Sequence, residues 1–245
     1  MNGPFHYRGK KVRVDKAFAM PVAGITIRET SFLDHHKSVL RAIEKYPDRI
    51  VGTFMCNIHL GAEKAVKAMN FFVKKKGFRA LKLHPTMHRW WGERSLPILE
   101  PIIEHATKLG LPILWHTGDT PYGLPVQVAP IAERFPDANF ILCHFGTQMI
   151  TYALEAIYVA KKNDNIYLET GWGPLPRLRE GVNSVGPERL IFGTDCPPLD
   201  MGGHLRNIEA LGFPKPLGVG LKEEQLDLIL SGNIARLMKI KPSQL

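Results

Sequence analysis

Polar residues that can bind metal ions or move protons follow several apolar runs of the chain. The segment "LPILWHTGD" places His116 at the end of a run with the composition of a buried strand, and "NFILCHFG" does the same for His144. A third run, "RLIFGTDCPP", is followed by Asp195. Imidazole and carboxylate are ligands that a catalytic zinc ion prefers, and such an ion makes hydroxide available at neutral pH. The pattern predicts metal-assisted chemistry if these side chains meet.

Each of these residues also has a structural explanation when it is taken alone. A histidine after a strand is commonly a hydrogen-bonded structural residue, and this interpretation applies to His59, His84 and His88. Asp195 precedes two prolines, which is ordinary turn chemistry. Glu169, in "YLETGW", could face an outer helix and pair with a lysine there. Only the recurrence of His116, His144 and Asp195 at strand ends favours a functional site.

Short β-type apolar runs alternate with stretches of helical spacing from about residue 12 onward. Seven strands are predicted, at residues 14–20, 50–56, 78–84, 111–116, 139–144, 166–170 and 190–194. Helices are predicted at residues 32–46, 62–76, 96–109, 126–134, 148–162, 175–185, 205–211 and 223–239. Strands that alternate with helices in this way indicate a parallel sheet covered by helices.

An open doubly wound sheet and a closed (β/α)8 barrel both satisfy this alternation. No strand runs into a glycine-rich phosphate-binding motif, and polar residues follow strands along the whole chain, which favours the barrel. The predicted fold is therefore α/β, a (β/α)8 TIM-like barrel that lacks the usual first strand. We expect one domain over residues 1–245, because no linker or low-complexity tract divides the chain.

Composition narrows the class of protein. The chain has 245 residues and 44% hydrophobic content, enough for a sizeable core. No apolar run approaches the ~20 residues that span a bilayer, and the N-terminus lacks the apolar centre of a secretory signal, so we expect a cytoplasmic protein with no membrane partner. Three cysteines without C-x-x-C spacing indicate neither a disulfide framework nor a cysteine zinc site.

The net charge of +9 comes from basic residues that are dispersed along the chain. A solvated basic surface explains this charge better than a nucleic-acid interface, for which one continuous basic stripe would be expected. We therefore expect no nucleic-acid partner. Attraction of a small anionic substrate remains compatible with the charge.

Five segments together resemble a known family. "FRALKLHP", "LPILWHTGD", "NFILCHFG", "RLIFGTDCPP" and "SGNIARLM" are similar, in order and approximate spacing, to the amidohydrolase-related (amidohydrolase 2) family of metal-dependent barrel hydrolases. This family also contains the aminocarboxymuconate-semialdehyde decarboxylase type. The resemblance covers roughly residues 14–241. It implies a divalent metal, with zinc as the expected ion.

The resemblance also implies roles for individual residues. His116 matches a metal-ligand histidine, and Asp195 matches the aspartate that contacts the metal and shuttles the proton of the catalytic water. His144 matches the histidine that assists this water or binds a second metal. Lys82 occupies a position where some relatives carry a metal-bridging carboxylated lysine; here we expect an ordinary lysine that neutralises substrate charge.

Further substrate contacts are expected around the mouth of the barrel. His84 lies beside Lys82 in "LKLHP", and Trp172 and Arg177 follow the predicted strand at 166–170. The segment "MHRWWGERS" offers aromatic faces and guanidinium groups that suit a planar carboxylated ligand. The same segment is equally compatible with an aromatic latch that packs the loop against the barrel.

The chain departs from the family at one important point. The family's first strand ends in His-x-His, which supplies two metal ligands, and this chain has no such motif. Three explanations are open: a missing strand that carried the site, recruitment of other groups such as His59 or His84, or chemistry without a metal. An open barrel edge also exposes unpaired backbone groups, so a homodimer is one expected remedy.

These observations lead to three hypotheses of function. The first is a metal-dependent hydrolase of a small carboxylated cyclic amide, lactone or ester. In it a metal-activated water attacks the carbonyl, Asp195 takes its proton, and His144 stabilises the oxyanion or protonates the leaving group. The second is a non-oxidative decarboxylase of an aromatic or muconate-like acid at the same site. The third is a catalytically silent barrel that serves as a binding or assembly module.

Overall fold

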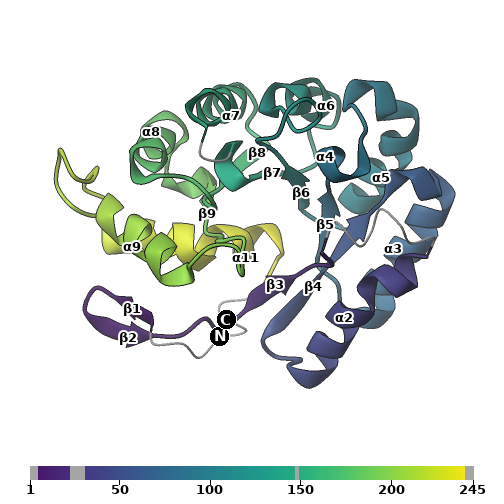
Figure 1. The fold of residues 1–245 in the computed structure, drawn as a ribbon, viewed down its shortest axis with the longest axis horizontal. Coiled ribbons are helices and arrows are strands. Elements are labelled where there is room, and N and C mark those ends of the chain that lie inside the picture. Colours follow the sequence, from purple (N-terminus) through teal and green to yellow (C-terminus); the bar gives the residue numbers. More distant parts are fainter. Residues whose placement is uncertain (1–4, 23–30, 147–148, 241–245) are drawn as a thin grey trace.

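A computed structural model describes residues 5–22, 31–146 and 149–240 of the chain. Its main sheet has seven parallel strands in sequential order, and this sheet curls into an incomplete barrel (Figure 1). The strands are β3 (Ala17–Ala19), β4 (Ile50–Cys56), β5 (Ala80–Leu83), β6 (Ile113–His116), β7 (Phe140–Cys143), β8 (Ile166–Glu169) and β9 (Leu190–Ile191). The prediction of a TIM-like barrel with seven recognisable strands is confirmed.

A second, two-stranded sheet was not predicted. Strands β1 (Phe5–Tyr7) and β2 (Lys10–Val12) pair antiparallel around a turn at Arg8 and Gly9, both of which have positive φ. The strands are too short to show an alternating apolar pattern, so the sequence gives no strand signal there. The predicted strand at 14–20 is likewise shorter, because only residues 17–19 pair with β4.

Helices follow most strands and cover the outer face of the sheet (Figure 1). The longer ones are α2 (Phe32–Lys45), α3 (Ala62–Lys76), α5 (Leu96–Lys108), α7 (Ile150–Lys162), α8 (Leu175–Val185) and α9 (Met201–Leu211). The shorter ones are α4 (Pro85–His88), α6 (Ala129–Arg134), α10 (Glu223–Asp227) and α11 (Asn233–Leu237). Helix α3 ends at Gly77, whose left-handed φ of 71° suits a residue without a Cβ atom.

Most predicted helices are present with shifted ends. The one predicted at 126–134 begins as the 3-10 helix η3 (Pro125–Val128) before α6, and the one predicted at 205–211 begins four residues earlier. The helix predicted at 223–239 is divided into α10, the π-helix η6 (Leu228–Gly232) and α11. Residue 148, the predicted start of α7, lies outside the described residues. No helix in the described ranges is long and apolar enough to cross a membrane.

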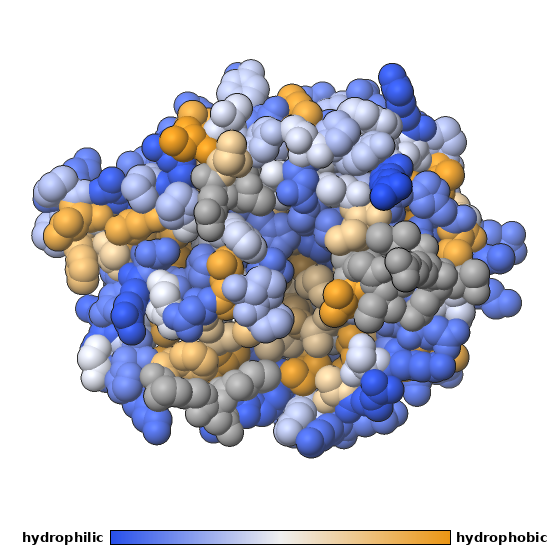
Figure 2. Space-filling model, viewed as in Figure 1, coloured by the Kyte–Doolittle hydropathy of each residue, from blue (hydrophilic) through white to orange (hydrophobic). Residues whose placement is uncertain are grey.

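The sheet has two edges, β3 and β9, which do not pair with each other in the described residues. Helix α11 lies in the gap between them (Figure 1). Its residues Ile234 and Leu237 pack against the side chains inside the barrel. Figure 2 shows apolar residues gathered in a hollow in this part of the view. One side of the barrel is therefore open.

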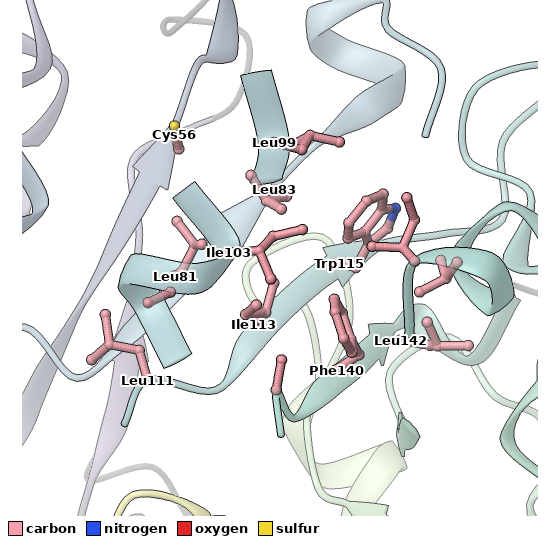
Figure 3. Close-up of a cluster of buried hydrophobic side chains, with 14 of the residues drawn as sticks. Cys56, Leu81, Leu83, Leu99, Ile103, Leu111, Ile113, Trp115, Phe140 and Leu142 are labelled. Atoms are coloured by element: carbon pink, nitrogen blue, oxygen red, sulfur yellow. The ribbon is translucent and has the colours of Figure 1, made fainter. Parts of the chain in front are cut away.

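The alternation of side chains along the strands divides the core in two. Outward-facing residues such as Leu81, Ile113, Trp115, Phe140 and Leu142 are fully buried against the surrounding helices (Figure 3). The intervening residues point into the barrel and form a separate apolar cluster. Because Lys82, His116 and Glu169 occupy inward positions of their strands, the same alternation turns them toward the interior.

One buried histidine joins the helical layer to the sheet. His36, on α2, is enclosed by the rings of Phe54 and Phe72, with centroids 5.1 and 4.6 Å away. Its Nδ1–H donates to the Phe32 carbonyl over 2.7 Å, and its Nε2 accepts from the Met55 backbone N–H over 2.9 Å. Only a neutral imidazole has one donor and one acceptor. Burial lowers the pKa of His36 to about 4, consistent with this neutral form.

Candidate functional site

Three imidazoles and a carboxylate meet at the carboxyl ends of the strands. The ring of His84, after β5, stacks on that of His116, at the end of β6, with centroids 3.7 Å apart. The His144 ring follows β7 and lies 4.9 Å from His116. Asp195, after β9, has its Oδ2 atom 3.8 Å from His144 Nδ1. The strand ends thus bring together residues that lie up to 111 positions apart in the sequence.

The other predicted substrate residues fall into two groups. Lys82 is buried inside the barrel, and its charge lowers the pKa of the imidazoles of His84, His116 and His144. Trp172 Nε1 donates to Asp195 Oδ2 over 2.9 Å at the mouth. Arg177 instead pairs with Glu180 on its own helix, and within the described ranges no hydrogen bond or ion pair links it to the cluster.

Glu169 is a further member of the cluster. Its Oε2 accepts from the His144 backbone N–H over 2.7 Å, and its Oε1 accepts from that of Gly171 over 2.6 Å. A Cβ atom on Gly193 would lie 1.9 Å from Oε1, so glycine there leaves room for the carboxylate. The alternative of an outer pairing with a lysine is wrong, because Glu169 points inward from β8. Its position at the end of a strand was the available sequence signal.

Asp119 was missed by the sequence reasoning. Its Oδ2 lies 2.5 Å from His116 Nε2. A carboxylate only accepts, so the imidazole N–H donates and Nδ1 of the neutral ring is left without its proton. The loop is closed by hydrogen bonds between Gly118 N and the Gly123 carbonyl and between Gly123 N and the Asp119 carbonyl. The sequence signal was the T-G-D-T-P turn directly after His116.

Left-handed backbone places several side chains of the site. Trp172, Asp195 and His144 have φ values of 60°, 51° and 72°, in a region that non-glycine residues seldom adopt. Phe145, the neighbour of His144, has a φ of 48° and a fully buried side chain. A Cβ atom on Gly181 of α8 would lie 2.7 Å from the Phe145 ring, so the ring occupies space that only glycine leaves free.

The electrostatics of the cluster favour neutral imidazoles. Burial is the main cause that lowers the pKa of His84, His116 and His144, and the charge of Lys82 adds to it. The hydrogen bond that the His116 ring donates to Asp119 acts in the opposite direction and raises the pKa of His116. Burial raises the pKa of Glu169, while its two backbone hydrogen bonds oppose this shift. Neutral histidines can accept protons, so the cluster is suited to proton transfer.

The cluster meets only part of the requirements of a metal site. His116 Nδ1 and His144 Nδ1 are buried without a hydrogen-bond partner, as ligand atoms would be. A catalytic zinc, however, takes three protein ligands. In the described part of the chain no group of three or more His, Cys, Asp or Glu side chains converges as a metal cage would require. The residues present do not form a complete cage, and zinc at His116 and Asp195 stays a prediction.

Residues weighed as alternatives lie in structural positions. His59 Nε2 contacts the His88 carbonyl at 2.6 Å, which ties the 3-10 helix η1 (Ile58–Leu60) to α4. Trp90 is buried with its ring edge-on to Trp115, so this residue acts as a latch. Trp91 is partly exposed and packs against Tyr122. Of the cysteines, Cys56 and Cys143 are buried and Cys196 is exposed.

Several solved structures share this fold. An uncharacterized TIM-barrel protein from Bordetella bronchiseptica superposes with a TM-score of 0.72 at 20% identity, covering 92% of this chain and 78% of its own. The 2,6-dihydroxybenzoate decarboxylase from Rhizobium gives 0.66 at 16% identity, covering 91% and 80%. The 5-carboxyvanillate decarboxylase from Novosphingobium aromaticivorans, which has bound manganese, gives 0.69 at 13% identity, covering 92% and 77%.

The sequence itself carries the assignment to a family, because these structural likenesses at low identity show the fold alone. No curated protein sequence is significantly similar to the chain. A family model described as amidohydrolase matches residues 15–240. This match includes all seven strands of the barrel and every residue of the cluster. The chain belongs to the amidohydrolase family and is an enzyme of that family.

Proposed function

We propose that this enzyme catalyses the non-oxidative decarboxylation of a small aromatic carboxylic acid. The observation that carries the proposal is the buried Lys82 ammonium, which lies beneath the neutral imidazoles at the strand ends. The buried Glu169 carboxyl interacts with this cation, and a substrate carboxylate bound at the strand ends would add a second negative partner. The solved decarboxylases that share the fold act on hydroxylated benzoates, which are small planar anions of this kind.

Decarboxylation requires the ring carbon to gain a proton as the carbon–carbon bond breaks. The electron pair of that bond stays on the ring carbon, carbon dioxide leaves, and the proton takes its place. Lys82 would hold the carboxylate among buried side chains at the strand ends, where the ion pair is strong. Glu169, whose pKa is raised by burial, is the proposed acid, and Asp195 with Trp172 lines the mouth. Metal chemistry enters no step here, because the described residues do not form a complete cage.

Hydrolysis is the alternative reaction at the same site. The His144 imidazole lies between two carboxylates, with Nδ1 3.9 Å from Glu169 Oε2 and 3.8 Å from Asp195 Oδ2. A base flanked in this way could activate a water molecule against a lactone or cyclic amide. The decarboxylase is preferred because the stacked, planar rings of His84 and His116 suit an aromatic acid.

The test is product analysis with the purified full chain. We expect carbon dioxide and the corresponding phenol from a panel of hydroxybenzoates, and at least ~100-fold slower turnover in Lys82→Met. Lys64→Met, on the exposed face of α3, is the matched control and should leave the rate unchanged. Ring opening of a lactone or cyclic amide without carbon dioxide would establish hydrolysis instead. Substrate binding without turnover of either class would favour the silent barrel.

A further inference from the structure

Two neighbouring tryptophans in the segment after β5 contact different parts of the chain around β6. Trp90 is buried, and its ring lies edge-on to that of Trp115 with centroids 5.3 Å apart. Trp91 is partly exposed, and its ring lies edge-on to that of Tyr122 with centroids 5.1 Å apart. Trp115 belongs to β6 and Tyr122 to the loop that follows it. The tryptophan pair therefore contacts both the strand and the loop that meet at the candidate site.

The loop after β6 carries a carboxylate that is half exposed to water. The Asp119 side chain is 46% exposed, yet its Oδ2 atom lies 2.5 Å from His116 Nε2. Water competes for the lone pairs of a carboxylate in such a position, so the net gain from its hydrogen bond is small unless the backbone holds it in place. The contact between Asp119 and His116 therefore depends on a loop with a fixed conformation.

Two side-chain contacts hold the tip of this loop. Thr120 and Pro121 are exposed at the tip, and Tyr122 follows them. The Gln127 side-chain amide donates to the Pro121 carbonyl over 2.9 Å. The Tyr122 ring packs against Trp91. Aromatic pairs with this geometry stabilise a structure by more than the area that they bury. The ring contact is therefore well suited to fix the tip.

Trp91 can serve as an anchor because its own segment is fixed. The Trp91 carbonyl accepts from the Ser95 N–H over 3.0 Å, and the Trp90 N–H donates to the Pro85 carbonyl over 3.2 Å. The Arg94 guanidinium lies over the Trp91 ring, with its central carbon 5.8 Å from the centroid. A cation over an aromatic face is attracted to it. These contacts restrain the Trp91 ring that the loop packs against.

We propose that Trp91 is a positioning residue that acts through Tyr122 to keep Asp119 on His116. The ring contact holds the loop, the loop holds the carboxylate on the His116 Nε2–H, and the ring of His116 thereby keeps the tautomer whose Nδ1 can accept a proton. The competing explanation is direct contact between Trp91 and the substrate. The effect on turnover rests on the proposed function, whereas the effect on the hydrogen bond between Asp119 and His116 does not.

A double-mutant cycle in steady-state kinetics tests the effect on turnover, with the full chain and the hydroxybenzoate panel. Trp91→Ala should lower kcat about 3–10-fold with little change in KM, as expected for the loss of an aromatic pair, and Trp91→Phe should restore most of it. In an Asp119→Asn background Trp91→Ala should lower kcat less than about twofold, because the contact that it supports is already lost. Tyr158→Ala, an exposed aromatic residue on α7, is the matched control and should leave kcat unchanged. A full effect of Trp91→Ala in the Asp119→Asn background, or a raised KM with unchanged kcat, would overturn the proposal.

Proton NMR of the same proteins tests the hydrogen bond without any turnover. The short contact should give a strongly downfield imidazole proton signal, assigned by its loss in His116→Asn and in Asp119→Asn. We expect this signal to move upfield or disappear in Trp91→Ala and in Tyr122→Leu, and to persist in Trp91→Phe and Tyr158→Ala. An unchanged signal in Trp91→Ala would overturn the proposal whatever the kinetics show. A changed signal in a protein that decarboxylates none of the acids would support the positioning role and contradict only the proposed function.

Discussion

The two sides of the barrel are held together by different means. Strands β4 to β8 pair with neighbours on both sides, and their outer faces pack against helices through fully buried rings such as Phe54 and Phe140. The β3 side has a three-residue strand, one paired edge and half-buried side chains that face a cavity. The closed side therefore carries most of the packing that stabilises the barrel, and the open side carries less of it.

The largest test of this difference compares two phenylalanines. Phe54→Ala removes a ring packed against Phe32, His36 and Phe72, and should lower the free energy of unfolding by about 3–5 kcal/mol. Phe18→Ala, at the half-buried edge strand, should cost about 1 kcal/mol. Both values come from denaturant unfolding of the purified chain. Equal losses would mean that the open side is packed as well as the closed side.

Acid should weaken the closed side through His36. Its pKa is about 4 when folded and 6.5 when unfolded, so between these values the unfolded chain binds more protons. Stability from this residue is complete above pH 6.5 and is lost as the pH falls toward 4, by about 3 kcal/mol in all. We expect His36→Gln to be less stable at pH 7, with a stability that changes less over this pH window. The control Val126→Ala changes an exposed residue that does not titrate and should keep the wild-type slope. A slope unchanged in His36→Gln would exclude this residue as its source.

The same contrast exists within the candidate site. Asp119 holds the buried His116 ring at 2.5 Å, whereas Trp172 holds the half-exposed Asp195 at 2.9 Å. Carboxylates that orient a functional histidine are commonly worth ~10–100-fold in activity. We expect Asp119→Asn to reduce kcat by that factor with little change in KM, and Trp172→Phe to act mainly on KM. Steady-state kinetics measures both effects. A larger loss of kcat in Trp172→Phe than in Asp119→Asn would mean that the contact of Trp172 with Asp195 matters more for catalysis than the contact of Asp119 with His116.

The smallest effect concerns two glycines with left-handed backbone. Gly77 caps α3 on the closed side with a φ of 71°, and Gly9 lies in the hairpin with a φ of 73°. A Cβ atom added at either position would meet no other atom within 4 Å. Alanine at either position therefore adds only the strain of a left-handed backbone, which costs about 1 kcal/mol of stability. Gly77→Ala should lower global stability by this amount, and Gly77→Asn by less. Gly9→Ala should show its cost in hydrogen exchange of β1 and β2 while the global transition stays in place.

The strands could be predicted from sequence because apolar runs rich in β-forming residues, bounded by turn residues and separated by helical stretches, have few alternative structures. The hairpin could not, since Phe5–Tyr7 and Lys10–Val12 carry no periodic signal. The division of the last helix by η6 was also invisible, because its apolar spacing runs through the π-turn without interruption. The spacing of apolar residues shows which face of a helix or strand is buried. It does not show local changes in backbone hydrogen bonding such as a π-turn.

The site was predictable where a residue type and a strand end coincide. His116, His144 and Asp195 met that condition, and the structure brings them together. Asp119 was missed because its role arises from a turn that folds back on His116. Arg177 was placed near the site by sequence position alone, and its pairing with Glu180 depends on helical spacing that the strand-end rule ignores. Partners within loops and helices need three-dimensional information.

Phe145 couples the outer layer of the barrel to the reaction. Its ring fills the space left by Gly181 on α8, and its backbone adjoins His144 in the same left-handed turn. A change of one methyl group on the solvent-side helix would thus move an imidazole on the opposite face of the sheet. Variants of Gly181 should lose activity at a lower temperature than the one at which they unfold. Gly181 is also a position at which laboratory evolution could change substrate preference without altering a residue that touches the substrate.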